Sequence, residues 1–395
     1  MQLFPNYSNN ELENLFYHKP ERFHKRSDRN LLAYALGATL YMPATKPNIA
    51  QDLLTKKHAG LSSMVIDLED AIGDKQVDWA EELLEREFNT LQDGVSQGTI
   101  LEDELPLIFI RIRNREQLQR ILCRLQDLLH LLAGFVIPKF APETGEGILS
   151  DIKTVSTEHN PLFAMPILET NQVMNKETRL SELLQIKAIT DRYKEQVLNI
   201  RIGATDFSGI FGIRRNPETT VYDINVVRDC ITDIINIFLR RESSYVISGP
   251  VWEYFSTKER LLKPQLRQTP FREKFGNEGL KYRAELIDDY MDGFLREIFM
   301  DITNGLVGKT IIHPSHIIPV QALNVVSYEE YTDALTILSE VSGHVGVMKS
   351  QFANKMNEVK PHSYWAQKIL FKSKIYGVLH EQNTYLDLLK KEVFI

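Results

Sequence analysis

Residues 162–170 read LFAMPILET, and residues 197–206 read VLNIRIGATD. Both stretches are near-continuous apolar runs with an acidic residue, Glu169 or Asp206, at or next to the end, rather than runs that alternate between apolar and polar positions. Strands that are covered on both faces of a parallel sheet have this composition. Between them, residues 179–193 carry apolar side chains three and four positions apart, the spacing of an amphipathic helix. The two stretches therefore predict consecutive βα units of a parallel sheet.

The same unit recurs along the rest of the chain. Further helical patterns cover residues 80–91, 116–132 and 226–241. Eight short apolar runs alternate with such patterns, at residues 38–42, 63–68, 107–112, 134–137, 162–168, 197–202, 244–247 and 309–312. Because eight βα units close a (β/α)₈ barrel, we expect an α/β fold of the TIM-barrel type.

The barrel pattern does not account for the whole chain. We expect an N-terminal arm over residues 1–35, the barrel over 36–325 and a C-terminal helical extension over 326–395. Residues 250–292, after the seventh strand, are a long excursion of mixed charge and are expected to form an insertion at the barrel face or flank. The arm contains a basic segment, residues 18–29, which is expected to be solvated, with a phosphate or subunit contact as the alternative.

Composition limits the functional class. The 395 residues include 46 basic and 53 acidic side chains, for a net charge of −7, which argues against broad nucleic-acid binding. The two cysteines, Cys123 and Cys230, cannot form a disulfide framework, and this fits a reducing compartment. Residues 1–17 do not read as a signal peptide, and the longest apolar run, 128–138, is too short to span a bilayer. A cytoplasmic location is the expectation.

Polar residues follow the predicted strands at the end where barrel enzymes carry their active sites. We expect Glu169 and Asp206 to bind Mg²⁺, because two carboxylates supply hard oxygen ligands and leave positions for water and substrate. Arg111 is expected to provide a fixed positive charge for a developing oxyanion. Glu69 and Asp70 would orient metal-bound water. Capping of the following helices is the simpler explanation for one such carboxylate, but less so for acidic residues at three strand ends.

Other residues at the strand ends leave alternatives open. Lys139 is expected to form a salt bridge or to bind a substrate carboxylate, with a Schiff-base lysine as the second choice. Pro43 and Thr205 are further candidates for substrate contact. Asp67 either faces the barrel interior or pairs with a basic neighbour, and His313 is either an acid/base group or a structural hydrogen-bonding group.

The glycines around Asp206 carry a separate expectation. Gly203, Gly209 and Gly212 are expected to loosen the loop that bears Asp206. Their order does not match a dinucleotide-binding fingerprint, which needs its glycines between strand and helix in the GxGxxG arrangement.

Seven blocks of this sequence resemble the HpcH/HpaI aldolase and citrate lyase β-subunit family. They run in the family's order and cover roughly residues 36–325. The DLEDA and GK-x-x-IHP patterns are the specific ones, and FVIPK alone would be weak. The blocks are LYMPATKPN (40–48), MVIDLEDAIGDK (64–75), FIRIRN (109–114), FVIPK (135–139), MPILET (165–170), IRIGATDFSGIFG (200–212) and GLVGKTIIHPSHIIPV (305–320).

The resemblance implies a Mg²⁺-dependent barrel with Glu169 and Asp206 as metal ligands and Arg111 beside the substrate. It also implies an oligomer, since the acyl-CoA lyase branch commonly forms trimers or hexamers and completes its site from a neighbouring subunit. The chain departs from the family where Gly37 and Ala38 stand in place of the usual Arg-Ser pair, and in the length of the 250–292 excursion. It looks most like the divergent TIM-barrel C–C bond lyase branch associated with tellurite-resistance and stress gene clusters.

Three functions remain open from the sequence. The first is a Mg²⁺-dependent lyase or aldolase that acts on a small oxo- or hydroxy-acid, or its CoA thioester, through an enolate. The second is a lyase-like enzyme for a phosphorylated substrate, and the third is a catalytically silent barrel that acts as a scaffold or sensor. The basic residues that would hold a phosphate are Lys258, Arg260, Lys263, Arg267 and Arg272.

Overall fold

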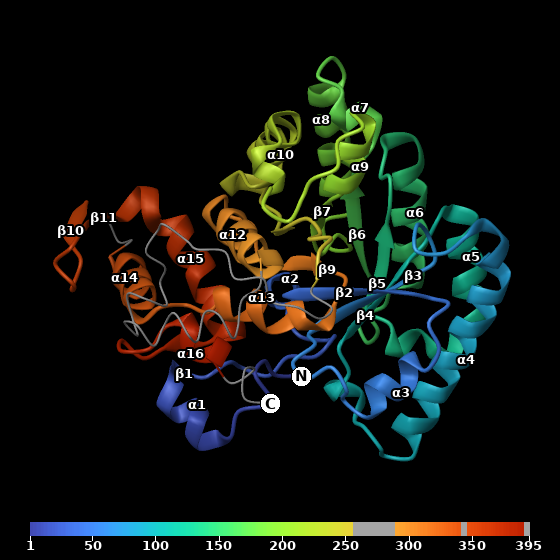
Figure 1. The fold of residues 1–395 in the computed structure, drawn as a ribbon, viewed down its shortest axis with the longest axis horizontal. Coiled ribbons are helices and arrows are strands. Elements are labelled where there is room, and N and C mark those ends of the chain that lie inside the picture. The colour runs from blue at the N-terminus through green and yellow to red at the C-terminus, as the bar shows by residue number, and fades with distance from the viewer. Residues whose placement is uncertain (256–288, 341–345, 391–395) are drawn as a thin grey trace.

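Eight parallel strands form one sheet that curls into a barrel in the computed structural model, which describes residues 1–255, 289–340 and 346–390 (Figure 1). Their order around the sheet is β8-β7-β6-β5-β4-β3-β2-β9. The predicted α/β barrel is therefore confirmed. The strands are β2 (Ala38–Pro43), β3 (Ser63–Asp67), β4 (Leu107–Arg111), β5 (Gly134–Ile137), β6 (Phe163–Leu168), β7 (Ile200–Ile202), β8 (Ile247–Ser248) and β9 (Lys309–Ile311).

The barrel closes just beyond the end of β8. Gly249 forms a parallel bridge with Lys309 on β9. The amide of Gly249 donates to the carbonyl of Gly308, and its own carbonyl accepts from the amide of Thr310, both at 3.0 Å. A Cβ atom at position 249 would lie 2.3 Å from a carboxylate oxygen of Asp301, so this close approach requires glycine.

The continuous apolar runs of the sequence are explained by burial on both faces of the sheet. Every residue of β3, β5 and β6 is buried. Helices cover the outer face and side chains fill the interior, as parallel barrels require. Around the sheet lie α3 (Ile49–Leu54), α4 (Val77–Ser96), α5 (Arg115–Arg124), α6 (Pro142–Val155), α7 (Asn171–Met174), α8 (Arg179–Arg192), α9 (Ala204–Ile210), α10 (Asn225–Phe238) and α12 (Asp289–Thr303).

Two helix predictions need correction. The helix expected over 116–132 ends at Arg124 and is followed by a 3₁₀ segment, Gln126–Leu131. The ammonium of Lys25 binds carbonyl groups at the end of this segment, at 2.9 Å from the oxygen of Leu132, and so satisfies groups that a continuing helix would have used. The glycine-rich loop expected around Asp206 is instead the helix α9, which begins one residue after Gly203.

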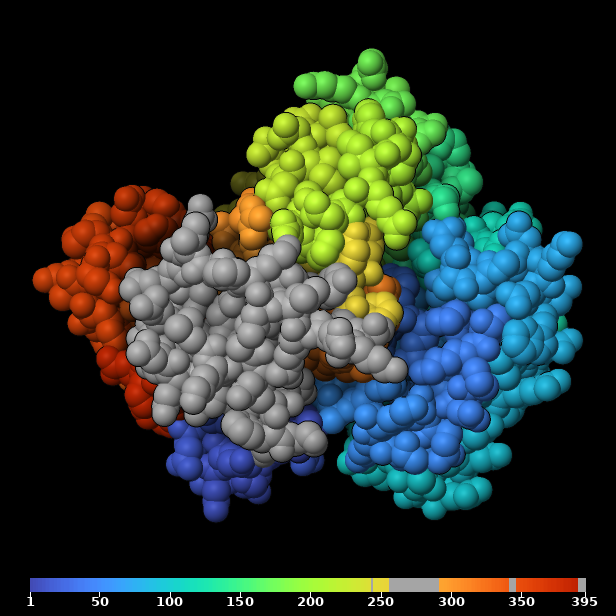
Figure 2. All heavy atoms as spheres, in the orientation of Figure 1, coloured from blue at the N-terminus to red at the C-terminus, as the bar shows by residue number. Residues whose placement is uncertain are grey.

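The N-terminal arm is attached to the C-terminal part of the chain. It contains α1 (Asn9–Leu15), β1 (Phe16–His18) and α2 (Arg29–Ala35), and β1 pairs antiparallel with β12 (Val378–Leu379). In the space-filling view the arm lies beside the C-terminal helices (Figure 2). The expectation of a solvated basic segment is wrong for Lys25 and Arg29, because both side chains bind carbonyl oxygens of the barrel.

The C-terminal extension has a small core of its own. The helix α13 (Ile317–Leu323) leads from the barrel into this extension. The elements of the extension are α14 (Tyr328–Ser339), the hairpin of β10 (Val347–Lys349) and β11 (Met356–Glu358), α15 (Val359–Tyr376), β12 and α16 (Tyr385–Lys390). Ala334 and Ile337 of α14 pack with Ala366 and Ile369 of α15. Among the described residues, no helix is both long and apolar enough to cross a membrane.

Candidate active site

Charged side chains from five neighbouring strand ends meet at the C-terminal mouth of the barrel. Asp67 ends β3 and Arg111 ends β4, while Lys139 and Glu169 follow β5 and β6. Asp206 lies in the first turn of α9, directly after β7. The structure thus brings together the residues that the sequence predicts at the strand ends, because the ends of parallel barrel strands share one rim.

An unbroken set of ion pairs joins three of these residues, Asp67, Arg111 and Lys139, to Glu69 and Asp70. The guanidinium of Arg111 binds Asp67 at two points, Nε to Oδ1 at 2.7 Å and Nη2 to Oδ2 at 2.5 Å. Its Nη1 lies 3.2 Å from Glu69 Oε2 and 3.7 Å from Asp70 Oδ2. The ammonium of Lys139 binds Glu69 Oε1 and lies 3.5 Å from Asp70 Oδ1. Asp67 is therefore the pairing partner of a basic neighbour, one of the two alternatives that its sequence position allowed.

Glu169 is a buried carboxylate of the mouth. One of its oxygens accepts the backbone amide of Lys139 at 2.8 Å, a contact made by a Lys139 backbone in the left-handed region, with φ of 46°. On its other side, a Cβ atom at Gly203 would lie 2.2 Å from Glu169 Oε2. Gly203 thus leaves the space that Glu169 occupies, a different role from the loosening predicted for it.

The electrostatics of Glu169 and Asp206 fit a bound cation. Burial, followed by the charge of Asp206, raises the pKa of Glu169 to about 8. Burial, followed by the charge of Asp70, also raises the pKa of Asp206. Carboxylates whose ionised forms are disfavoured by burial and by neighbouring negative charge are stabilised in those forms by a bound cation. Within the described residues there is no group of three or more His, Cys, Asp or Glu side chains placed to hold a metal.

Lys139 is held in its charged form. Burial opposes its charge, but the hydrogen bond to Glu69 and the charges of Glu69 and Asp70 outweigh burial and raise the pKa of the ammonium. A Schiff-base lysine requires the opposite shift, toward a neutral amine. The geometry therefore favours the ion-paired interpretation of this residue.

Two residues of the barrel interior were not predicted as part of the site. The ring of Tyr41, on β2, lies next to two arginines. Its centroid is 5.5 Å from the guanidinium carbon of Arg111 and 5.6 Å from that of Arg201. Arg201, on β7, is 1% exposed and bonds to the hydroxyls of Thr39 and Thr310 at 3.3 and 2.6 Å. Its Nε has no hydrogen-bond partner in the part of the chain that the structure describes. The sequence signal that could have identified Arg201 is a charged residue inside an otherwise apolar strand.

A network behind α9, buried except at Thr205 and Glu253, was also missed. The hydroxyl of Thr205 donates to Glu253 Oε1 at 2.6 Å, and Glu253 Oε2 accepts from Nε of Arg215 at 2.8 Å. Arg215 also binds Glu297, which pairs with Lys309 at 2.8 Å. Lys309 and Glu297 are fully buried, and Arg215 packs on the ring of Trp252, with the guanidinium carbon 4.8 Å from the ring centroid. The network therefore connects Thr205, which precedes Asp206, to Glu297 in the middle of α12.

The remaining candidates fall into three groups. Pro43 is at the end of β2, opposite Asp67 in register. His313 accepts the amide of Ser315 and caps a 3₁₀ turn, so its contacts are those of the structural alternative. The basic residues proposed to hold a phosphate, 258–272, lie outside the described residues.

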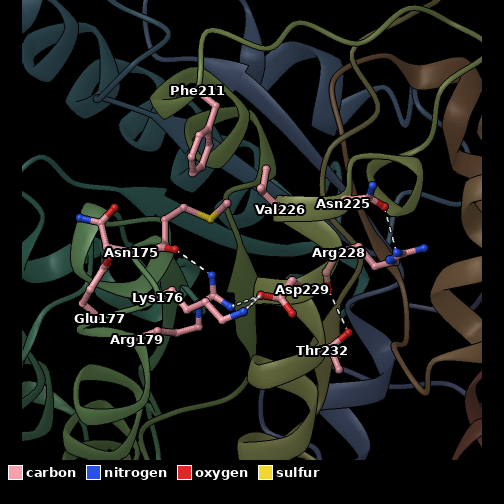
Figure 3. Close-up of a pocket in the computed structure, with 11 residues that line it drawn as sticks. Asn175, Lys176, Glu177, Arg179, Phe211, Asn225, Val226, Arg228, Asp229 and Thr232 are labelled. Atoms are coloured by element: carbon pink, nitrogen blue, oxygen red, sulfur yellow. Dashed lines mark hydrogen bonds and ion pairs between the residues drawn. The ribbon is translucent and has the colours of Figure 1, made fainter.

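A cavity of about 620 Å³ lies beside the mouth and is separate from the charged cluster. It is lined by residues that follow β6 and β7, including Met174 and Phe211, and by residues of α10. Figure 3 shows Arg179 turned toward Asp229, which it binds at 2.9 Å. The exposed cations Lys176 and Arg228 line the cavity together with the acidic Glu177 and Asp229, and the ammonium of Lys176 lies 3.8 Å from Asp229 Oδ2. None of Arg111, Glu169 and Asp206 lines this cavity.

A protein-family model described as a C–C bond lyase of the TIM-barrel fold matches residues 30–378. This range covers nearly the whole of the described barrel and most of the C-terminal extension. A search among curated proteins finds no match.

Solved structures of similar fold share little sequence with this chain. A citrate lyase from Burkholderia xenovorans LB400 is 15% identical, with a TM-score of 0.56, and the match covers 87% of this chain and 93% of that one. The CitE protein from Mycobacterium tuberculosis in complex with magnesium, acetoacetate and coenzyme A is 16% identical, with a TM-score of 0.48, over 86% of this chain and 99% of that one. RipC from Yersinia pestis is 14% identical, with a TM-score of 0.44, over 74% and 95%.

Proposed function

Because the chain belongs to the C–C bond lyase family of the TIM-barrel fold, we propose that it breaks or forms a carbon–carbon bond in a small oxo- or hydroxy-acid, or in its CoA thioester, with Mg²⁺ as its cofactor. The observation that carries this proposal is the buried carboxylate pair, Glu169 and Asp206, beside the fixed guanidinium of Arg111. Such a mouth suits a reaction that develops negative charge on a substrate oxygen.

Each charged residue then has a defined task. Glu169 and Asp206 would hold the Mg²⁺ ion, which supplies positive charge where an enolate develops. Arg111 is fixed by Asp67 along one edge, so its outer N–H groups keep one orientation for a substrate oxygen. Lys139, kept charged by Glu69 and Asp70, would bind the substrate carboxylate.

We assign proton transfer to the Glu69–Asp70 pair. Burial raises the pKa of Glu69, and a hydrogen bond between the two carboxyl groups adds to the rise. Burial also opposes the charge of Asp70, but the hydrogen bond from Glu69 and the nearby cations outweigh it and lower the pKa of Asp70. A carboxyl pair whose pKa values are pushed apart can keep a proton on one member and accept one on the other.

The cavity beside the mouth supports a CoA thioester as the substrate form. Lys176 and Arg228 offer positive charge for phosphate groups, and Phe211 and Val226 offer apolar contact. We expect the double variant Lys176→Ala/Arg228→Ala to raise KM for a thioester and to leave KM for the free acid unchanged. Equal effects on both substrates would favour the free acid.

The central experiment is deuterium exchange from solvent into pyruvate and acetyl-CoA, followed by NMR. We expect exchange only with Mg²⁺, and its loss in Glu169→Ala. Glu158→Ala, at an exposed position, is the matched control and should exchange like the wild type. Exchange that survives without metal in Glu169→Ala would contradict the mechanism. No Mg²⁺ binding by calorimetry would bring back the scaffold alternative.

The assembly and location of the protein are part of the same proposal. A cytoplasmic homo-oligomer, a trimer or hexamer, agrees with the family resemblance of the sequence. Light scattering of the purified protein at working concentration measures the mass directly. A monomer that is fully active in the exchange experiment would exclude a site completed by a neighbouring subunit.

A further inference from the structure

A second cavity, of about 260 Å³, lies at the opposite end of the barrel from the carboxylates. Its walls come from α2, from α15 and from residues 198 and 244–246, which lead into β7 and β8. These segments precede their strands, so the cavity opens at the N-terminal end, where barrel enzymes do not carry their chemistry. The cavity is therefore distinct from the proposed active site, and a ligand bound in it would be independent of the proposed function.

Two cations face this cavity, and no acid lines it. None of the lining residues is Asp or Glu. Lys368 lies 4.6 Å above the ring of Tyr364 and forms no ion pair with any residue that the structure describes. Arg29 binds the carbonyl oxygen of Val197 and lies 3.3 Å from Asn30 Oδ1, but its buried Nε has no partner among the described residues.

Neither of these partly buried cations forms an ion pair within the described chain. Burial lowers the pKa of Lys368 and of Arg29, which means that the folded chain disfavours the charged forms it holds there. Unpaired buried charges persist in proteins when a partner supplies the opposite charge. The partner would be an anion that enters the cavity.

The remaining wall residues indicate the shape and polarity of the anion. The rings of Tyr34 and Phe371 are stacked, with centroids 5.4 Å apart and planes at 13°. The hydroxyls of Tyr245 and Tyr364 are already bonded, to Asp191 and Ser244. The hydroxyl of Tyr34 has no partner in the described chain and remains available as a donor. Flat aromatic walls with few free polar groups suit a planar apolar ligand.

We propose that this cavity binds a small organic anion. Its flat apolar body would lie against the rings of Tyr34, Tyr245 and Tyr364, and its single carboxylate or phosphate group would bind Arg29 and Lys368. Such a ligand would touch the N-terminal arm, the barrel and the C-terminal extension at once. Because it binds only the folded chain, it would stabilise that arrangement in proportion to its concentration.

The test uses the full chain with four probes: benzoate, phenyl phosphate, inorganic phosphate and the uncharged benzamide. Binding is measured by calorimetry and by the shift of the unfolding temperature. We expect benzoate or phenyl phosphate to bind and the other two not to, and the stronger of the two binders tells whether the anionic group is a carboxylate or a phosphate. Benzamide binding as well as benzoate, or no binding of either aromatic anion, would overturn the proposal.

Lys368→Met provides the second arm, with Lys374→Met, an exposed position on the same helix, as its control. Because Lys368→Met removes one charge-assisted contact, we expect it to bind the anion about tenfold more weakly than the wild type. The control should bind the anion as tightly as the wild type. Without ligand, Lys368→Met should be at least as stable as the wild type, because a partly buried cation that has no ion-pair partner in the described chain has been removed. Lower stability with unchanged anion binding would assign Lys368 a structural role and refute the site.

Discussion

Asp67 and Arg111 stand opposite each other on β3 and β4 and bind through two parallel contacts of 2.7 and 2.5 Å. Asp67 is 2% exposed, so it has no access to solvent and acts only through this neighbour and two backbone amides. We predict that Asp67→Asn leaves Mg²⁺ affinity unchanged but lowers kcat by about 10–100-fold, because Arg111 loses its fixed orientation. Steady-state kinetics and calorimetric Mg²⁺ titration separate the two effects. An equal loss of Mg²⁺ affinity would mean that Asp67 supports the metal site itself.

Gly203→Ala should disable the metal site without unfolding the barrel. The added Cβ would lie 2.2 Å from Oε2 of Glu169 and 2.4 Å from its Cβ, so the carboxylate must move. We expect Mg²⁺ affinity to fall at least about tenfold. Gly209→Ala, in the same helix α9, adds a methyl group in open space and is the control. Wild-type affinity in Gly203→Ala, measured by calorimetry on folded protein, would remove Glu169 from the ligand set.

The network behind α9 is a stability element. Arg215→Met leaves Glu297 buried with less compensation, and we expect the free energy of unfolding to fall by about 3–5 kcal/mol. The double variant Arg215→Met/Glu297→Met should regain part of this loss, because no buried carboxylate is then left behind. Urea unfolding followed by circular dichroism measures both. Arg240→Met, which removes a guanidinium bonded to Asn236 at the surface, should have little effect.

His316 makes the fold sensitive to acid. Burial, and then the charges of His313 and Lys309, lowers its pKa to about 3, and its ring lies 4.3 Å from that of Phe294 between centroids. Because the folded-state pKa is depressed, the unfolded chain binds the proton more readily between about pH 6.5 and pH 3. Stability from this residue is present above pH 6.5 and is lost as the pH falls.

The His316→Gln variant tests this directly. Its free energy of unfolding should change less with pH than that of the wild type, by roughly 2–4 kcal/mol over this interval. The unfolding curves are compared at matched pH values, so that other groups cancel. Parallel pH profiles of the two proteins would show that His316 is not the responsible group.

The barrel and most of the site were predictable because their signals are local. Glu169 and Asp206 each follow an apolar run, and parallel strands bring such ends together whatever the details of packing. The limit is visible at Asp67, whose sequence position allowed two interpretations. Only the register of β3 against β4 selects the pairing with Arg111.

Other parts of the site depend on contacts between segments that are distant in the sequence, and such contacts give only a weak local sequence signal. Glu253 and Arg215 meet across 38 residues, and nothing near either of them indicates the partner. Arg201 was visible as a charge in an apolar run, but its place under Tyr41 follows from barrel closure. The glycines near Asp206 suggested a loop, and α9 forms there because its buried residues, Ala204, Phe207 and Ser208, lie on one face.

The pairing of β1 with β12 limits the order in which parts of this chain can fold. Phe16 of β1 lies opposite Leu379 of β12, so β1 cannot form its pairing until the C-terminal segment that contains β12 is present. During synthesis from the N-terminus, the barrel strands can assemble while the arm still lacks its partner. Contacts of such long sequence separation form slowly, and we expect a late step in refolding in which the arm docks. Completion of β1 is therefore expected to come late, although this strand precedes the barrel in the sequence.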